Sequence, residues 1–185
     1  MKCTTLGFSV LLASSSLASA QDQRDVFLDG ANNAKVHAAS GFVCPTKIGL
    51  FERDAVGERD PKASADFCSY SALDGVYGTI VLTPLSGPYD PKTALVPEFQ
   101  EQEATGGKVV GEASRKFGGA NVYTRSYGTS NLGDVHYRVQ FAASAIGQWA
   151  VQVTMEYASP RDDAVKQDFL NAVYDEALHK LGGAK

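Results

Sequence analysis

Apolar and polar residues alternate along much of the chain, with the period of β-strands that bury one face. From Gly41 onward, Gly, Pro, Asn and Asp interrupt the chain at short intervals and separate these stretches. The pattern predicts strands over residues 47–56, 65–71, 75–83, 108–117, 120–127, 133–143 and 149–157. Because the connections are short, we expect neighbouring strands to pair antiparallel.

Two hairpins stand out in the second half of the chain. Gly118-Gly119 lies between two strands and suits a two-residue turn of a primed type. That turn sets Glu112 opposite Arg125 and Val110 opposite Tyr127.

In 133–143 and 149–157 the odd-numbered residues are apolar. Both rows can face one core only if the loop has an odd number of residues, which Ala145-Ile146-Gly147 provides. This register sets Trp149 opposite Ala143 and Val151 opposite Phe141.

Two helices complete the pattern. One is expected over 91–104, where Pro97 must start, kink or divide it. The other is amphipathic, begins near Pro160 and ends before Gly182-Gly183. We therefore predict an α+β domain over 41–185, after a loosely structured segment over 21–40. Its antiparallel sheet of six to seven strands has one face covered by helices, in the order β-β-β-α-β-β-β-β-α.

This order of elements, over residues 41 to 181, resembles the Mog1/PsbP-like fold, including its periplasmic DcrB-like branch. The resemblance is one of topology, with no motif match, so no functional residue is carried over. It implies an α/β/α sandwich with helices on both faces, whereas the alternation in this sequence favours one covered face. It also implies an accessory or binding protein.

The first twenty residues have the three parts of a secretory signal peptide. Lys2 supplies the positive charge, Leu6 to Ala13 form a short apolar core, and Ala18-Ser19-Ala20 match the cleavage pattern. The apolar core is shorter than the roughly 20 residues that span a bilayer. We expect cleavage after Ala20 and a periplasmic or secreted protein, with no membrane anchor remaining.

Cleavage would remove Cys3 and leave Cys44 and Cys68. Two cysteines in an oxidising compartment most often pair. A redox-active pair is the alternative, but it usually has two residues between its cysteines, and here 23 intervene. The sequence therefore favours a structural disulfide.

The charge balance argues against nucleic acid as a partner. Without the signal peptide the chain has 16 basic and 21 acidic residues and no basic run. No cofactor motif is present, and the His and Cys residues are too scattered for a predicted metal site. The acidic residues Glu98, Glu101 and Glu103 fit a solvated helix face.

The histidines give one weak catalytic candidate. Asp134 lies two residues before His136 on one strand and could orient its imidazole, but no nucleophile motif accompanies the pair. A solvated histidine beside acidic groups is the simpler interpretation.

A polar sheet face is the main binding candidate, because tyrosines offer a large contact area at low entropic cost. The expected registers set His136 opposite Glu156, Arg138 opposite Thr154 and Gln140 opposite Gln152. Glu112, Lys116, Tyr123, Arg125 and Tyr127 join that face if the hairpins adjoin. Ordinary cross-strand pairing, or coverage by residues 21–40, would explain the same pattern.

The leading hypothesis is therefore an exported, non-catalytic protein that binds an unidentified protein or small ligand. A small hydrolase using His136 and Asp134, and a secreted inhibitor or effector, are the alternatives.

Overall fold

The computed structural model describes residues 25–183, which form two antiparallel sheets and three α-helices. The large sheet has the strand order β4-β5-β6-β7-β11-β10-β9-β8. Its strands are β4 (Lys47–Ile48), β5 (Phe51–Asp60), β6 (Ala65–Ala72), β7 (Val76–Pro84), β8 (Lys108–Phe117), β9 (Ala120–Leu132), β10 (Val135–Ile146) and β11 (Trp149–Ser159). The small sheet contains β1 (Phe27–Asp29), β2 (Lys35–His37) and β3 (Val43–Cys44), and the helices are α1 (Pro91–Ala94), α2 (Val96–Ala104) and α3 (Asp163–Leu181).

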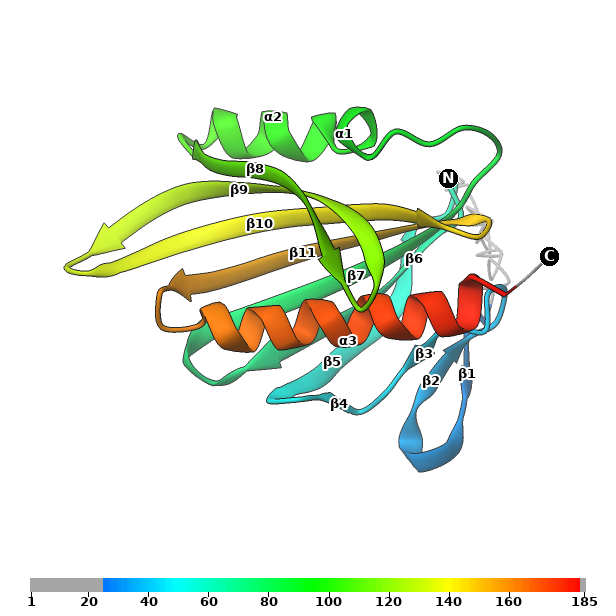
Figure 1. Ribbon diagram of the computed structural model, residues 1–185. Coiled ribbons are helices and arrows are strands. Elements are labelled where there is room, and N and C mark those ends of the chain that lie inside the picture. The colour runs from blue at the N-terminus through cyan, green and yellow to red at the C-terminus, as the bar shows by residue number, and fades with distance from the viewer. Residues whose placement is uncertain (1–24, 184–185) are drawn as a thin grey trace, which may run out of the picture.

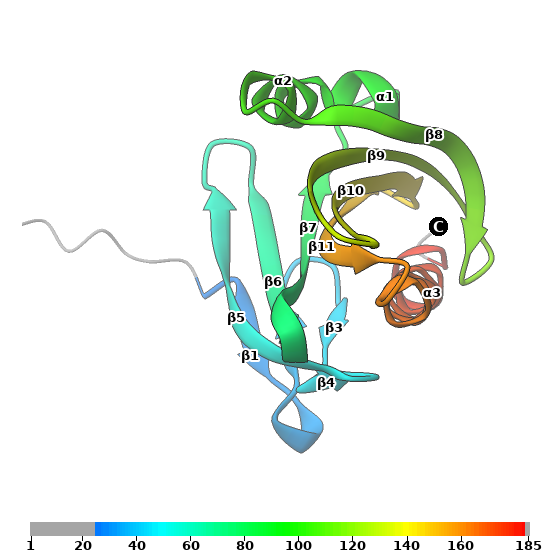
Figure 2. The same cartoon turned by 90° about the vertical axis from the view of Figure 1, so that its left-hand side faces the viewer.

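Helices lie on both faces of the large sheet. The helix α3 packs on one face, while α1 and α2 lie across the other (Figure 1). The sheet also curls around α3, so that β8 comes to lie beside this helix (Figure 2). The α+β class and the antiparallel pairing are confirmed. The prediction of one covered face was wrong, and the large sheet has eight strands rather than six or seven.

The turn between β10 and β11 explains the second covered face. Ile146 pairs with Trp149, so the loop is the two residues Gly147 and Gln148. Phe141 is therefore opposite Thr154, not Val151. Opposed residues now differ in parity, so the odd apolar rows of the two strands point to opposite faces. The sequence had predicted a three-residue loop and a single shared face, and both predictions were wrong.

Two hydrophobic cores result from this register. The larger lies between the sheet and α3 and includes Val151, Val153, Phe169, Leu170 and Val173. The smaller lies beneath α1 and α2 and contains Leu95, Phe99, Tyr127, Phe141 and Ala143. Each face of the sheet thus has apolar side chains that a helix removes from water.

The turn between β8 and β9 confirms the first predicted hairpin. Gly118 and Gly119 both have positive φ, at 52° and 90°, as a primed two-residue turn requires. Glu112 is opposite Arg125 as predicted. Val109, not Val110, is opposite Tyr127, because a β-bulge between Val109 and Gly111 shifts the register by one residue.

The predicted helix over 91–104 is divided. Asp90 caps α1 by accepting hydrogen bonds from the backbone N–H groups of Lys92 and Thr93, at 3.3 and 3.1 Å. The helix breaks at Leu95, and Pro97 occupies the first turn of α2, where its missing N–H costs nothing.

Residues 25–40 are more ordered than the sequence predicted. β1 and β2 form a hairpin whose connection includes Asn32 and Asn33 at positive φ. His37 anchors it: Nε2 lies 2.8 Å from Oδ2 of Asp66 on β6, and Nδ1 lies 2.6 Å from Oγ of Ser40. The imidazole is 1% exposed. Such a buried polar contact holds the hairpin against the large sheet.

Cys44 and Cys68 form the predicted disulfide, with their Cα atoms 6.4 Å apart, and join β3 to β6. Residues 1–20, with the expected signal peptide and Cys3, lie outside the described part of the chain. Within 25–183, no helix has the length and apolar character needed to cross a membrane.

Replacing both cysteines, Cys44→Ala with Cys68→Ala, should lower the free energy of unfolding by about 3.5 kcal/mol. The reason is that the unfolded chain gains the freedom of a loop of about 25 residues. Urea denaturation measures the difference, and reduced wild-type protein is the control. Equal stability of oxidised and reduced protein would show that the bond does not constrain the unfolded chain.

Phe99→Ala should cost about 3 kcal/mol, because Phe99 is 4% exposed at the centre of the smaller core. Val96 lies on the same helix and is 39% exposed, so Val96→Ala is a matched control expected to cost below about 0.5 kcal/mol. Similar costs in urea denaturation would mean that α2 does not cover this face.

Candidate functional site

A polar groove lies between β8 and the first turns of α3. Its volume is about 290 Å³, and we call it the β8–α3 groove. Residues 110–113, Arg115 and Phe117 of β8 form one wall, and Lys166 and Gln167 of α3 form the other. Thr124, Ser126, Arg138, Gln140 and Tyr157 of the intervening strands complete the lining. The curl of the sheet around α3 brings these elements together.

Positive charge gathers in this groove, although the chain has a net charge of −4. Neither Arg115 nor Arg138 makes a hydrogen bond or ion pair with any residue of the range 25–183. Lys166 is held in place, because its ammonium group lies 4.4 Å from the centre of the Tyr157 ring and 3.4 Å from Asp163. Glu112 is the one acidic residue in the lining, but its side chain lies on the opposite face of the sheet, where its carboxylate is 2.8 Å from Lys92 of α1. The groove is therefore suited to an anionic ligand.

Arg138 has a defined position against β9. A Cβ atom added to Gly128 would lie 2.6 Å from Nη1 of Arg138 and 3.1 Å from Val110. The guanidinium group thus occupies the space that glycine leaves on the strand. Arg138 also borders a second hollow, of about 400 Å³, which Lys108 and His136 line as well.

Gln140 adds a neutral donor at the floor of the groove. Gln140 is 6% exposed, and its side-chain Oε1 accepts a hydrogen bond from the hydroxyl of Ser126 at 3.4 Å. Its amide nitrogen has no partner among the described residues. A carboxylate or carbonyl oxygen bound beside Arg138 could accept from this N–H group.

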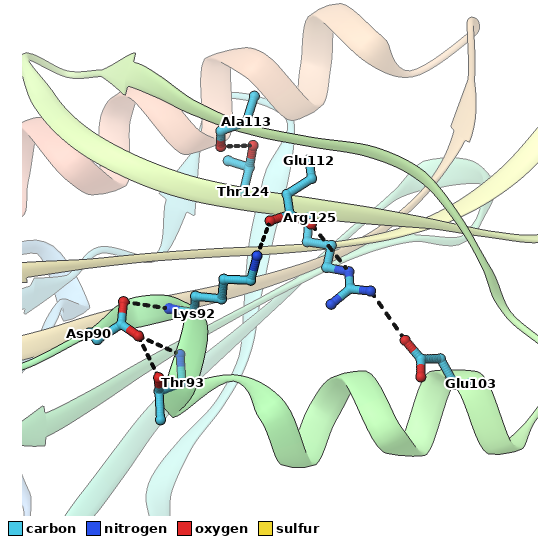
Figure 3. Close-up of polar contacts among 8 residues, drawn as sticks. All are labelled: Asp90, Lys92, Thr93, Glu103, Glu112, Ala113, Thr124 and Arg125. Atoms are coloured by element: carbon cyan, nitrogen blue, oxygen red, sulfur yellow. Dashed lines mark hydrogen bonds and ion pairs between the residues drawn. The ribbon is translucent and has the colours of Figure 1, made fainter.

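A second arginine, Arg125, lies on the opposite face of the sheet. Its guanidinium group is 4.5 Å from the centre of the Phe99 ring and 3.2 Å from Glu103, both on α2. Figure 3 shows Arg125 between Glu103 and Glu112, with Lys92 of α1 also reaching Glu112. The side chain is 19% exposed. This cluster binds α1 and α2 to the sheet and leaves little of Arg125 for a ligand.

The pKa values in this cluster reflect burial and charge. Burial raises the pKa of Tyr127 to about 12, and the hydrogen bond that its hydroxyl donates to Glu103 contributes. Burial, with the neighbouring Glu112, also raises the pKa of Tyr123 to about 12. The hydrogen bond from Lys92 lowers the pKa of Glu112. The neutral tyrosines and the ionised Glu112 are therefore the forms that this packing favours.

The ten residues of the predicted binding face do not form one surface. Glu112, Tyr123, Arg125, Tyr127, Gln152, Thr154 and Glu156 lie on the face that carries α1 and α2, and His136, Arg138 and Gln140 lie on the face toward α3. The two-residue turn is the reason, since it places His136 opposite Ser159 rather than Glu156. Arg138 and Gln140 do enter the groove, with partners that the sequence did not indicate.

The predicted catalytic pair is not assembled. Nδ1 of His136 lies 2.8 Å from Oδ1 of Asn131, and no contact joins it to Asp134 in the described chain. Within the same residues, no three His, Cys, Asp or Glu side chains gather as a metal site would require. Ser40, His37 and Asp66 do form a hydrogen-bonded series. However, His37 is buried against the rings of Phe27 and Trp149, so this series supports the N-terminal hairpin.

Comparison with known proteins gives one finding on the fold. No protein-family model and no curated protein sequence matches the chain. Among solved structures, the chain is similar to the solution structure of cyanobacterial PsbP (CyanoP) from Synechocystis sp. PCC 6803. The identity is 12%, the match covers 72% of this chain and 92% of that one, and the TM-score is 0.38. The expected resemblance to a PsbP-like fold is thus confirmed as a weak one.

The free energy of unfolding should fall as the pH rises from about 10 to about 12. The ordinary pKa of tyrosine is 10.0, and in this range the unfolded chain has lost the proton that folded Tyr127 retains. Urea denaturation at several pH values measures the slope. Tyr127→Phe should flatten it, whereas Tyr77→Phe, at a position 51% exposed, serves as the control. An unchanged slope in Tyr127→Phe would contradict the assignment.

Proposed function

We propose that this protein is an exported, non-catalytic binding protein whose ligand is an anion held in the β8–α3 groove. The signal-peptide pattern of residues 1–20 supports export, with cleavage after Ala20 and delivery to the periplasm. The disulfide between Cys44 and Cys68 is consistent with an oxidising compartment.

The position of Arg138 carries this proposal. Its guanidinium group lines the groove without an intramolecular acid, although the chain has 21 acidic residues. Structural arginines usually pair with carboxylates or carbonyls, as Arg125 pairs here with Glu103 and Glu112. An unpaired guanidinium beside the amide of Gln140 leaves donors available for an external oxyanion.

The chemistry of these donors favours a carboxylate or phosphate oxygen. A guanidinium can bind either group with two parallel hydrogen bonds, and such charge-assisted bonds are stronger than neutral ones. Lys166 and Arg115 would add attraction from the sides of the groove. Because these cations contact solvent, salt should weaken the binding.

Two variants test this proposal by different means. Arg138→Gln removes the charge, whereas Gly128→Ala keeps it and displaces the guanidinium with the new Cβ. Isothermal titration at low ionic strength would use hexaglutamate and inorganic tripolyphosphate as anionic probes, with hexalysine as the probe of opposite charge. We expect each variant to weaken binding of the anions about tenfold, which corresponds to about 1.4 kcal/mol.

Arg59→Gln is the matched control, because Arg59 is an exposed arginine on β5, outside the groove. It should bind both anions like the wild type. If neither anion binds the wild type, or if Arg59→Gln loses as much affinity as Arg138→Gln, the groove is not an anion site.

A further inference from the structure

We infer that the ligand of the β8–α3 groove is an extended acidic segment of a partner protein, which adds as a strand to the outer edge of β8. The inference rests on the proposed function of the groove and identifies its ligand class. Three features carry it: the free edge, the charge on it, and the spacing of the two unpaired arginines.

The outer edge of β8 has unpaired backbone groups. Among residues 25–183, β8 is the last strand of the sheet and pairs with β9 alone. Across the two-residue turn, Phe117 and Ala120 form a hydrogen-bonded pair, so alternate residues of β8 bond to β9. Glu112, Ser114 and Lys116 therefore direct their N–H and C=O groups outward. No described residue bonds to them from that side.

This edge is also long and accessible. β8 has ten residues, and all except Ala113 and Phe117 are exposed. Val109 and Val110 are 44% and 51% exposed. Proteins usually shorten or cover such an edge, because it can pair with any extended chain. In the described part of the chain, no strand pairs with this edge, and it lies beside the β8–α3 groove.

The charge on the strand determines which chain can pair with it. Lys108, Arg115 and Lys116 make β8 basic, and its one acid, Glu112, is already paired with Lys92. A second copy of β8 would bring these cations together, which disfavours self-association. An acidic segment would instead meet complementary charge at both ends of the strand, at Lys108 and at Arg115 and Lys116.

The spacing of the arginines favours an extended ligand. Both arginines have partners on β9: Arg115 of β8 is opposite Val122, and Arg138 of β10 is opposite Gly128. Six residues of strand separate these positions, which is about 20 Å at roughly 3.3 Å per residue. An added strand of about six residues spans the same length of backbone, so its side chains can reach both arginines. Every second side chain of such a strand would face the groove, and those side chains should be acidic.

The experiment uses a fluorescein-labelled peptide with four Glu-Thr repeats and measures its binding to the whole protein by fluorescence anisotropy. Ser114→Pro removes one outward N–H without breaking a bond to β9, and proline is tolerated at such edge positions. Ser114→Ala keeps the N–H and is the matched control. We expect Ser114→Pro to weaken binding at least tenfold and Ser114→Ala to leave it unchanged.

A second measurement does not depend on the folding of a variant. Two further peptides are methylated at the backbone nitrogens, one at every threonine and one at every glutamate. Because successive N–H groups of a strand point to opposite edges, each peptide loses the donors of one edge but keeps every charge. One of the two should bind the wild-type protein at least tenfold more weakly. A peptide with four Lys-Thr repeats should not bind.

The outcomes separate the two proposals. Strand addition is wrong if binding of the acidic peptide is lost in Arg138→Gln but is unchanged in Ser114→Pro. The same result requires that both N-methylated peptides bind as tightly as the unmodified peptide. In that case the groove would still be an anion site. If the acidic peptide and tripolyphosphate both fail to bind, the proposed function itself is wrong.

Discussion

A loop of two residues, Gly147 and Gln148, joins β10 to β11 and fixes which side chains fill each face of the large sheet. Gly147 has a φ of 59°, and an added Cβ would lie 2.1 Å from the carbonyl oxygen of Leu181, so the turn is held against the end of α3. Its length directs Phe141 and Val153 to opposite faces of the sheet. Both faces then have apolar side chains, and each needs a covering helix. This register therefore sets the layers of the fold. It also sets the face of the sheet on which each polar residue of these strands lies.

Arg125 and Arg138 show how the two faces give one residue type different roles. They lie on adjacent strands, but Arg125 is under α2, with the Phe99 ring and the Glu103 carboxylate as partners. Arg138 is on the face of α3, in a groove where no carboxylate of the described chain pairs with it. A buried charge needs compensation from the protein, whereas a charge that remains in contact with water does not. Arg125 therefore contributes to the packing of α2, and Arg138 remains available to a ligand.

The curl of the sheet connects the fold with the proposed binding. It brings β8 beside α3 (Figure 2), and at Gly118, directly after β8, an added Cβ would lie 2.2 Å from the backbone nitrogen of Asp175. Farther from this contact, residues 110–113 and Arg115 of β8 and Lys166 of α3 line opposite sides of a groove. The edge of the sheet and the basic side chains thus adjoin because of one tertiary feature. The proposed anion binding rests on this local excess of positive charge in an otherwise acidic chain.

Local sequence patterns were enough to predict most of the strands and helices, the Gly118-Gly119 turn, the pairing of Glu112 with Arg125, and the disulfide. The strands, helices and turn follow from hydrophobic periods and from glycines that accept positive φ. The disulfide follows because two cysteines remain once Cys3 is assigned to a signal peptide. The face that each strand presents to a helix could not be predicted in this way, because one residue more or less in a loop reverses a strand without changing its pattern. The ordered hairpin at residues 27–37 depends on His37 meeting Asp66, 29 residues away. The groove likewise joins β8, β10 and α3, whose contacts arise from the curl of the sheet and leave no periodic signal in the sequence.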